Sequence, residues 1–409
     1  MFLLYSPSPV AYTDGKEEVM RIHGAGCCLI DTIYGECDYT SEAFKQLWSR
    51  TRGDGGLIEG GLVFTEDLER FSGLDHRTII ERLTGGRPAD AINIGGPAVV
   101  ALIHSAQILA CEGTTVEFFG ATGDDENGAL IRRLLEKTPL IDHLTTVTDR
   151  PTPTTEVFND PTQQGGKGER SFLNTIGAAW EIKAEDLGPH FYDAEIILLG
   201  GTALVPHLHD DLHQVLKRAK GNGCITVVGT VFDFRNERLA PHTKWPLGHD
   251  DSYQYIDVLV SDEEEALRLT GTQTVRAAAE RLRVSGVGAF IITRGAEAMY
   301  VWSSGHLVAP SPLTTMPVSA YFDELLRADP SLRRDTTGCG DNFLGGILVA
   351  LVKAKGREAT MLDLCAWGAA SGGLALTYSG GTYHESAPSE KAALLAPAIT
   401  AYYERGGER

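Results

Sequence analysis

Short apolar runs rich in β-branched residues alternate with helical patterns along most of this chain, and this alternation limits its fold more than any other feature. Five runs, VEFFG, EIILLG, CITVVG, IDVLVS and AFIIT, indicate buried strands that end at Gly120 and Gly200, begin at Cys224, and end at Ser261 and Thr293. Strands that alternate with helices form βαβ units around a largely parallel sheet. We therefore expect an α/β protein with helices at 97–110, 125–137, 207–220, 262–270, 273–284, 341–354, 359–377 and 388–404.

Three segments interrupt the alternation. Residues 35–75 are polar and rich in glycine, whereas residues 145–178 alternate Thr with Val before the sequences DPTQQGGKGE and RSFLNT. The second segment is typical of a β-hairpin. Residues 306–334 indicate an extended loop with one helical piece, SAYFDELLRAD.

The composition is that of an ordinary soluble globular protein, and its charge excludes several classes of partner. The 409 residues are 43% hydrophobic and 22% charged, and 36 basic against 55 acidic residues leave a net charge of −19. Such acidity argues against a nucleic-acid partner, which binds basic surfaces, and against anionic membranes. An anionic substrate would need local positive potential, for example at helix N-termini.

Cysteine usage and the N-terminal sequence indicate a cytoplasmic protein. Seven cysteines in so long a chain, with no C-x-x-C pair, are typical of buried thiols in a reducing compartment. No Lys or Arg precedes Lys16, which is atypical of a signal peptide. No apolar run approaches the roughly 18 residues of a membrane span.

The strongest chemical signal is the string DTTGCGDNF at residues 335–343, which precedes the apolar run LGGILVALVKA. Glycines allow a tight turn, and the first turn of the following helix offers unpaired N–H groups to an anionic oxygen. Asp341 beside such a site could act as a general base toward a substrate hydroxyl while the amides hold a phosphoryl group. The alternative is that Asp341 is only an N-cap after a glycine turn.

This string resembles the D-T-x-G-A-G-D signature of the ribokinase-like (PfkB) carbohydrate kinases. Counterparts of the family's other motifs follow in the right order, so the resemblance covers roughly residues 20–385. These counterparts are GCCLID at 26–31, NIGGPA at 93–98, FGATGDDENG at 119–128, GERSF at 168–172, DEEEA at 262–266 and TRGAEA at 293–298.

The resemblance implies a ribokinase-like fold, which is a three-layer α/β/α sandwich with a mainly parallel central sheet and a small β-lid. It implies a single domain over residues 1–409, with a lid contributed by about 32–75 and 145–178 and an inserted loop at about 306–334. Ligands in such sheets bind beyond the C-terminal ends of the strands.

The resemblance also implies ATP-dependent phosphorylation of a hydroxyl on a sugar or sugar derivative. Asp341 would deprotonate the attacking hydroxyl, and the amides of Gly338, Cys339 and Gly340 would stabilise the transferred phosphoryl group. Phosphoryl transfer requires mainly positioning and charge stabilisation, so this short set of groups is sufficient.

The remaining site residues implied by the resemblance bind the substrate, the nucleotide or a metal ion. Glu265 would act on Mg²⁺ mostly through water, and a monovalent cation such as K⁺ and a homodimer formed through the lid belong to the same expectation. The substrate would be held by Asp31, Gly95, Gly96 and Arg170, and the nucleotide by Thr293, Gly295 and Thr337.

Three departures from the family pattern bear on substrate identity more than on reaction type. Cys339 replaces an Ala and is either an oxidation-sensitive thiol at a helix N-terminus or a tolerated small residue. Val100 and Asp262 each stand where the family often has Asn. Two alternatives to a sugar kinase therefore stay open: a nucleoside kinase, since LIDTIY at 29–34 is adenosine-kinase-like, and a catalytically inactive ligand-binding regulator.

Other motifs have simpler explanations. No P-loop string occurs, and GAG at 24–26 lacks the third glycine of a dinucleotide fingerprint. His209 and His213 could bind zinc from one helical face, although a solvated helix start with acidic residues in its first turn explains them better. Residues 55–61 fit a lid linker better than a phosphate loop, and helix-dipole compensation explains most of the acidic run at 262–265.

Overall fold

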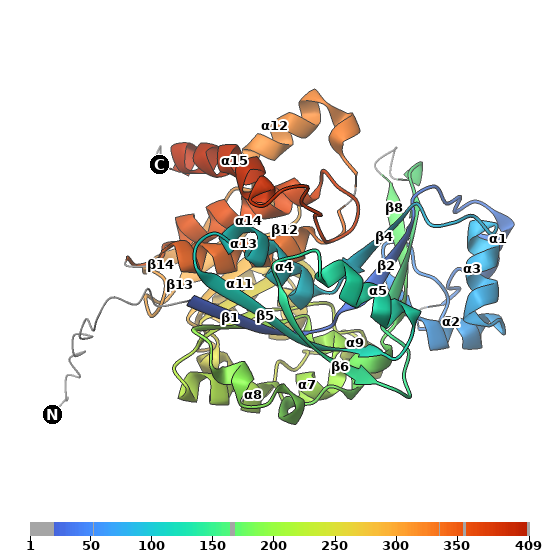
Figure 1. The fold of residues 1–409 in the computed structure, drawn as a ribbon, viewed down its shortest axis with the longest axis horizontal. Coiled ribbons are helices and arrows are strands. Elements are labelled where there is room, and N and C mark those ends of the chain that lie inside the picture. Colours follow the sequence, from blue (N-terminus) through green and yellow to red (C-terminus); the bar gives the residue numbers. More distant parts are fainter. Residues whose placement is uncertain (1–19, 52, 164–167, 335, 355–356, 407–409) are drawn as a thin grey trace.

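A computed structural model describes residues 20–51, 53–163, 168–334, 336–354 and 357–406. It shows a central sheet with helices on both faces and a second, smaller sheet at one end, which is on the right in Figure 1. The predicted α/β sandwich is confirmed.

The central sheet has nine strands in the order β14-β13-β12-β11-β10-β9-β1-β5-β6. All neighbouring pairs from β12 to β6 are parallel, whereas β13 and β14 add two antiparallel strands at one edge. The strands are β1 Met20–Gly26, β5 Thr114–Gly123, β6 Ile141–Val147, β9 Ile196–Gly200, β10 Ile225–Gly229, β11 Val258–Asp262, β12 Ala289–Arg294, β13 Glu297–Ser303 and β14 Ser311–Met316.

Both faces of this sheet are buried, which explains why its strands appear in the sequence as continuous apolar runs. In β9, Ile196 and Leu198 enter the core on one face, and Ile197 and Leu199 enter the core on the other. The first face is covered by α4 Pro97–Leu109, α5 Glu126–Leu135, α12 Ala320–Ala328, α13 Cys339–Lys353, α14 Met361–Ala375 and α15 Glu390–Gly406.

The opposite face is covered by shorter helices, which lie at the bottom of Figure 1 and behind the sheet. The helix expected at 207–220 is broken at Asp211, where the backbone leaves the helical conformation. Within the described residues, no helix is both long enough and apolar enough to cross a bilayer. The helices of this part are α7 Pro206–Asp210, α8 Leu212–Gly221, α9 Phe234–Leu239, α10 Glu263–Thr270 and α11 Val275–Arg283.

The smaller sheet has five strands in the order β3-β8-β7-β2-β4. The expected hairpin is present as the antiparallel pair β7–β8. The polar segment 35–75 supplies only one short strand to this sheet and forms two short helices, the first of which is capped by Ser41, while Asp75 caps the helix that follows the segment. The elements are β2 Leu29–Tyr34, β3 Leu62–Phe64, β4 Ala91–Gly95, β7 Thr154–Asp160, β8 Glu169–Thr175, α1 Glu42–Leu47, α2 Thr65–Ser72 and α3 His76–Thr84.

The segment 306–334 contains more regular structure than an inserted loop. It holds the expected helix as α12, but it also holds β14, which pairs with β13 at the sheet edge. The strand residues SPLTTM carry only weak apolar alternation because they form an edge strand, which has one paired neighbour.

A row of three glycines lies across the C-terminal ends of the central strands. Gly26, Gly200 and Gly229 are in register on β1, β9 and β10. A Cβ atom at Gly200 would lie 2.9 Å from the Cα atom of Ala98 on α4, and one at Gly229 would clash with Leu344 on α13. The missing side chains therefore let both helices approach the sheet, which places their N-termini at the same edge.

Two glycine substitutions test this close approach. We expect Gly26→Ala to lower the free energy of unfolding by about 1–3 kcal/mol, because the new Cβ atom would lie 2.7 Å from the Cβ of Ala98 and clash with the carbonyl oxygen of Gly200. Gly221→Ala is the matched control, since no neighbour lies within 4 Å of its added Cβ, and it should be neutral or stabilise by about 0.5–1 kcal/mol. Urea denaturation measures both, and equal effects would contradict the packing argument.

Candidate active site

The glycine-rich turn before α13 forms as the motif predicts, and only glycine fits its centre. Gly338 has a φ of 76°, and a Cβ atom there would clash with the backbone of Gly381. Gly338 is the N-cap of α13, so Asp341 lies in the first turn of the helix. The interpretation of Asp341 as the N-cap is therefore wrong. Asp335, the first residue of the motif, lies outside the described residues.

Backbone N–H groups at the start of α13 are available to a ligand. Among the described residues, the N–H groups of Gly340 and Asp341 have no hydrogen-bond acceptor, whereas the N–H of Cys339 donates to the Thr336 carbonyl at 3.3 Å. No neighbour lies within 4 Å of a Cβ atom placed on Gly340, so there is open space beside this residue. Together with the helix dipole, these groups favour an anionic oxygen.

The Asp341 side chain is half-buried and makes no hydrogen bond or ion pair within the described part of the chain. Burial alone raises its pKa to about 6. A carboxylate that is desolvated and unpaired, and whose pKa lies close to neutral pH, has the properties of a general base. The local environment therefore fits the role that the sequence predicts.

Asp31 lies on β2 and is 5% exposed. Its neighbour across the β2–β4 pair is Asn93, and its carboxylate occupies the space that a side chain at Gly95 would need. Gly96, with a φ of 111°, is the N-cap of α4. The predicted substrate-binding residues Asp31, Gly95 and Gly96 are thus in direct proximity.

One loop connects this group to Asp341. The Asn93 amide donates to the carbonyl oxygens of Ser379 and Thr382 at 3.0 and 2.9 Å. The Asn342 amide donates to the carbonyl oxygens of Gly381 and Gly338, both at 2.8 Å. Asn93 and Asn342, which are neighbours of the predicted substrate-binding and catalytic residues, therefore hold the same loop, so the two parts of the site lie together.

Sequence reasoning missed a buried lysine beneath this turn. Lys391, 1% exposed on α15, donates to Asn342 Oδ1 at 3.1 Å and to Gln107 Oε1 at 3.2 Å. Tyr378 donates to the same Asn342 oxygen at 3.0 Å, and His104 Nδ1 lies 2.9 Å from it. Lys391 thus orients the residue that holds the Gly338 carbonyl. Its signal in the sequence is a lone lysine among the alanines and leucines of 390–398.

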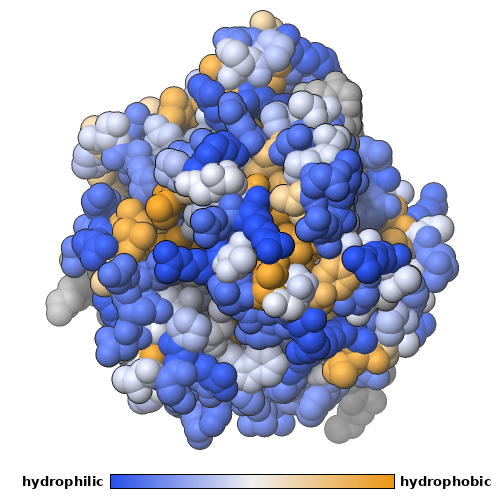
Figure 2. All heavy atoms as spheres, turned by 90° about the vertical axis from the view of Figure 1, so that its right-hand side faces the viewer, coloured by the Kyte–Doolittle hydropathy of each residue, from blue (hydrophilic) through white to orange (hydrophobic). Residues whose placement is uncertain are grey.

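The predicted lid residue Arg170 also reaches the glycine turn. It lies on β8 of the smaller sheet, and its Nη1 atom donates to Thr337 Oγ1 at 2.7 Å. Figure 2 views the molecule from this end and shows hydrophobic groups toward the middle of a mostly hydrophilic face. Arg170 therefore connects the smaller sheet to the start of α13.

The predicted nucleotide-side residues lie at the same edge of the central sheet. Thr293 pairs with Asp262 across β11 and β12, and Gly295, with a φ of 60°, lies in the exposed turn that follows. Asp262 and Glu265 form a capping box at the start of α10, so local capping adds to the dipole compensation expected for this acidic run. Thr230 donates to Glu265 Oε2 at 2.6 Å.

Glu265 is a buried carboxyl group in acidic surroundings. Burial, reinforced by the negative charges of Asp262 and Asp341, raises its pKa to about 8. A cation near these three carboxylates would relieve their mutual repulsion. Carboxylate oxygens are ligands that Mg²⁺ prefers, but these three do not form one close group of ligand atoms among the described residues, so they fit an ion that is held through water.

The structure does not bring the predicted zinc pair together. His209 lies on α7 with its Nδ1 atom 2.9 Å from Thr202 Oγ1, whereas His213 lies on α8 with its Nδ1 atom 2.9 Å from Ser252 Oγ. The break at Asp211 separates the two helices. No group of possible metal ligands within the described residues contains both histidines.

Comparisons with known proteins agree with this arrangement. The family model described as "pfkB family carbohydrate kinase" matches residues 103–388. A fructokinase from Vibrio alginolyticus is 24% identical over 268 residues, which cover 64% of this chain and 80% of that protein. A ribokinase from Arabidopsis thaliana is 27% identical over 260 residues, which cover 59% of this chain and 58% of that protein.

Solved structures show the same fold. The adenosine kinase from Sinorhizobium meliloti superposes with a TM-score of 0.67 at 18% sequence identity. The similarity covers 94% of this chain and all of that chain. This structural similarity, together with the matching family model, establishes the ribokinase-like fold.

Lys391 predicts a pH dependence of stability. Burial lowers its pKa from 10.5 to about 7, so between these values the unfolded chain binds more protons than the folded one, and stability rises with pH. From about pH 7 to 10, the free energy of unfolding of the wild type should rise by up to about 1.4 kcal/mol per pH unit relative to that of Lys391→Met. Urea denaturation at several pH values measures the difference, and parallel curves would contradict a desolvated ammonium.

Proposed function

The chain belongs to the pfkB family of carbohydrate kinases, and on this basis we propose that it transfers the γ-phosphoryl group of ATP to a hydroxyl of a sugar or sugar derivative. The observation that carries the proposal is Asp341, a half-buried carboxylate with no ion-pair partner among the described residues, next to unpaired N–H groups at the start of α13.

In the proposed reaction, Asp341 accepts the proton of the attacking hydroxyl. The N–H groups of Gly338, Cys339 and Gly340 donate to the transferred phosphoryl group, where negative charge increases. The N–H of Asp341, which has no acceptor among the described residues, adds a further donor. The turn is held in place by Asn342, so the N–H groups of Gly340 and Asp341 need no rearrangement during transfer. The N–H of Cys339, in contrast, must turn from the Thr336 carbonyl to the phosphoryl group.

The smaller sheet and the start of α4 would bind the substrate. Asp31 can accept hydrogen bonds from two hydroxyls, and Gly95 and Gly96 let a ligand approach the backbone. Arg170 would contact phosphate or substrate while it closes the smaller sheet over the reactants. Exclusion of water at this point would suppress hydrolysis of ATP.

The nucleotide side is formed by Thr293, Gly295 and Thr337, at the end of β12 and at the glycine turn. Mg²⁺, which neutralises the ATP phosphates when bound, would be held through water by Glu265. Activation by a monovalent cation such as K⁺ and dimerisation through the smaller sheet stay predictions. Rates measured with and without K⁺ and gel filtration at micromolar concentration test them.

Two sequence relatives, named fructokinase and ribokinase, favour a sugar over a nucleoside as the substrate. A coupled assay of ADP release over fructose, ribose, other sugars and adenosine decides the point. We expect turnover with at least one sugar. Turnover with adenosine alone would establish the nucleoside alternative, and ADP release with none of them would favour the ligand-binding regulator.

Asp341→Asn tests the catalytic base. We expect kcat to fall about 10²–10⁴-fold because proton removal is lost, while the Kd for ATP changes little. The matched control is Asp323→Asn on α12, which alters an exposed carboxylate paired with Arg327. Equal kcat in wild type and Asp341→Asn would refute the assignment.

The pH profile gives a second test of Asp341. The base must be deprotonated, and its pKa is raised to about 6 by burial. We expect kcat/KM to fall about tenfold per pH unit below about pH 6 and to level off above it. The residual activity of Asp341→Asn should lack this acidic limb. An acidic limb of the same shape in the variant would assign the titration to another group.

A further inference from the structure

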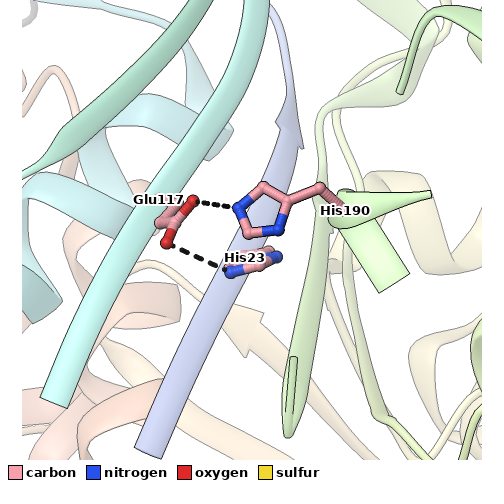
Figure 3. Close-up of side chains that lie close together, drawn as sticks. All are labelled: His23, Glu117 and His190. Carbon is pink, nitrogen blue, oxygen red and sulfur yellow. Dashed lines mark hydrogen bonds and ion pairs between the residues drawn. The ribbon is translucent and has the colours of Figure 1, made fainter. Parts of the chain in front are cut away.

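Four ionisable side chains meet on the face of the central sheet opposite α4 and α13. His23 of β1 and Glu117 of β5 are paired across neighbouring strands. His143 comes from β6, and His190 begins the short 3-10 helix η3, His190–Tyr192. Figure 3 shows His23 and His190 pointing at the Glu117 carboxylate. We call these four residues the histidine cluster.

His23 supplies the observation that calls for a ligand. Its side chain is fully buried, and its Nδ1 atom lies 3.1 Å from the carbonyl oxygen of Phe191. A carbonyl only accepts hydrogen bonds, so Nδ1 carries the proton and Nε2 presents its lone pair. Within the described residues this buried Nε2 atom has no hydrogen-bond partner. Such an atom is costly unless something binds it.

The groups facing that lone pair are themselves potential ligands. His23 Nε2 lies 3.5 Å from Glu117 Oε1, and His190 Nε2 lies 2.9 Å from Glu117 Oε2. Desolvation raises the pKa of Glu117, but hydrogen bonds from His143 and His190 outweigh this effect and hold the pKa below its ordinary value. Burial lowers the pKa of His23, which keeps its imidazole neutral. A neutral imidazole and an ionised carboxylate are the forms that bind metals. His190 Nε2, which donates to Glu117 without an ion, would bind one in the tautomer that carries the proton on Nδ1, 3.8 Å from Asp193 Oδ2.

We propose that His23, Glu117 and His190 bind one divalent transition-metal ion of the Zn²⁺ type. One ligand atom from each residue lies within 4.8 Å of the others. Ligands about 2.0–2.1 Å from a tetrahedral zinc ion are separated by roughly 3.3 Å, and each histidine nitrogen lies at a similar distance from one of the two Glu117 oxygens, His23 Nε2 at 3.5 Å from Oε1 and His190 Nε2 at 2.9 Å from Oε2. The fourth position is open to water, because the His190 side chain is 52% exposed.

His143 positions the carboxylate in this site. Its Nε2 atom lies 2.6 Å from Glu117 Oε2, and its ring is stacked on Phe119 with the centroids 4.4 Å apart. The stacking fixes the imidazole, and the imidazole orients the carboxylate toward His23. Carboxylate ligands of metals are commonly held in this way by an outer hydrogen bond.

The chemistry of the ligands selects the ion. Imidazole nitrogens suit Zn²⁺, Cu²⁺ and Ni²⁺, whereas Mg²⁺ requires oxygen ligands. Excess Mg²⁺ from the kinase reaction would therefore not fill the histidine cluster. Because His190 lies on η3 and the other residues lie on strands, the ion would anchor η3 to the sheet.

A second group, His213, His249 and Asp251, is the competing candidate. Its histidine rings are stacked with centroids 4.5 Å apart, and His213 Nδ1 already lies 2.9 Å from Ser252 Oγ. His249 and Asp251 are exposed. None of its atoms is a buried nitrogen without a partner. The histidine cluster is therefore the better-built site.

Zinc titration of the metal-stripped full-length protein in excess Mg²⁺ tests the proposal. We expect one Zn²⁺ per chain by calorimetry and elemental analysis, together with a higher unfolding temperature. His190→Ala should weaken Zn²⁺ binding at least tenfold, and its half-exposed position lets the variant fold. His306→Ala, which removes another exposed histidine, is the control and should bind as wild type does.

Three results would overturn the proposal. The first is no Zn²⁺ binding to wild type at micromolar concentration, and the second is equal affinity in wild type and His190→Ala. The third is loss of the bound ion in His249→Ala with retention in His190→Ala, which would place the site at the competing group. Circular dichroism of the metal-free variants separates loss of a ligand from loss of the fold.

Discussion

The close approach of two helices to the sheet edge is the constraint on which the rest of this structure depends. Gly26, Gly200 and Gly229 lie in register and leave no side chain between the strand ends and the helices α4 and α13. Both helix N-termini consequently reach the edge where Asp31 follows β1. Any side chain on those glycines would push away the groups that must act together.

Desolvation is the common cause of the unusual acid–base properties around the glycine turn. It raises the pKa values of Asp341 and Glu265 and lowers that of Lys391. Burying such groups reduces stability, as does any buried ionisable group without full charge compensation. Here the buried ammonium is used to orient Asn342, whose amide holds the backbone of the turn. The site thus exchanges stability for a fixed geometry.

The central sheet carries different chemistry at different points along one strand. Near the middle of β1, His23 faces Glu117 and His190 on the sheet surface. At the C-terminal end of β1 the chain turns into β2, which carries Asp31 of the proposed substrate site. Mg²⁺ is a hard ion that prefers phosphate and other oxygen ligands, whereas the ion proposed for the histidine cluster is softer and prefers imidazole. The two ions would therefore not compete for the two sites.

The parallel α/β fold, the glycine turn before α13 and the order of the family motifs could be predicted from the amino-acid sequence, because each depends on residues close together in the chain. The sequence did not reveal the two short helices within 35–75, because each buries only two side chains and only the first has a capping side chain, Ser41. Only the tertiary structure placed Lys391 beside Asn342, Asn93 beside the 379–382 loop and His23 beside His190. Those contacts join distant segments, and their partners are chosen by packing rather than by sequence spacing.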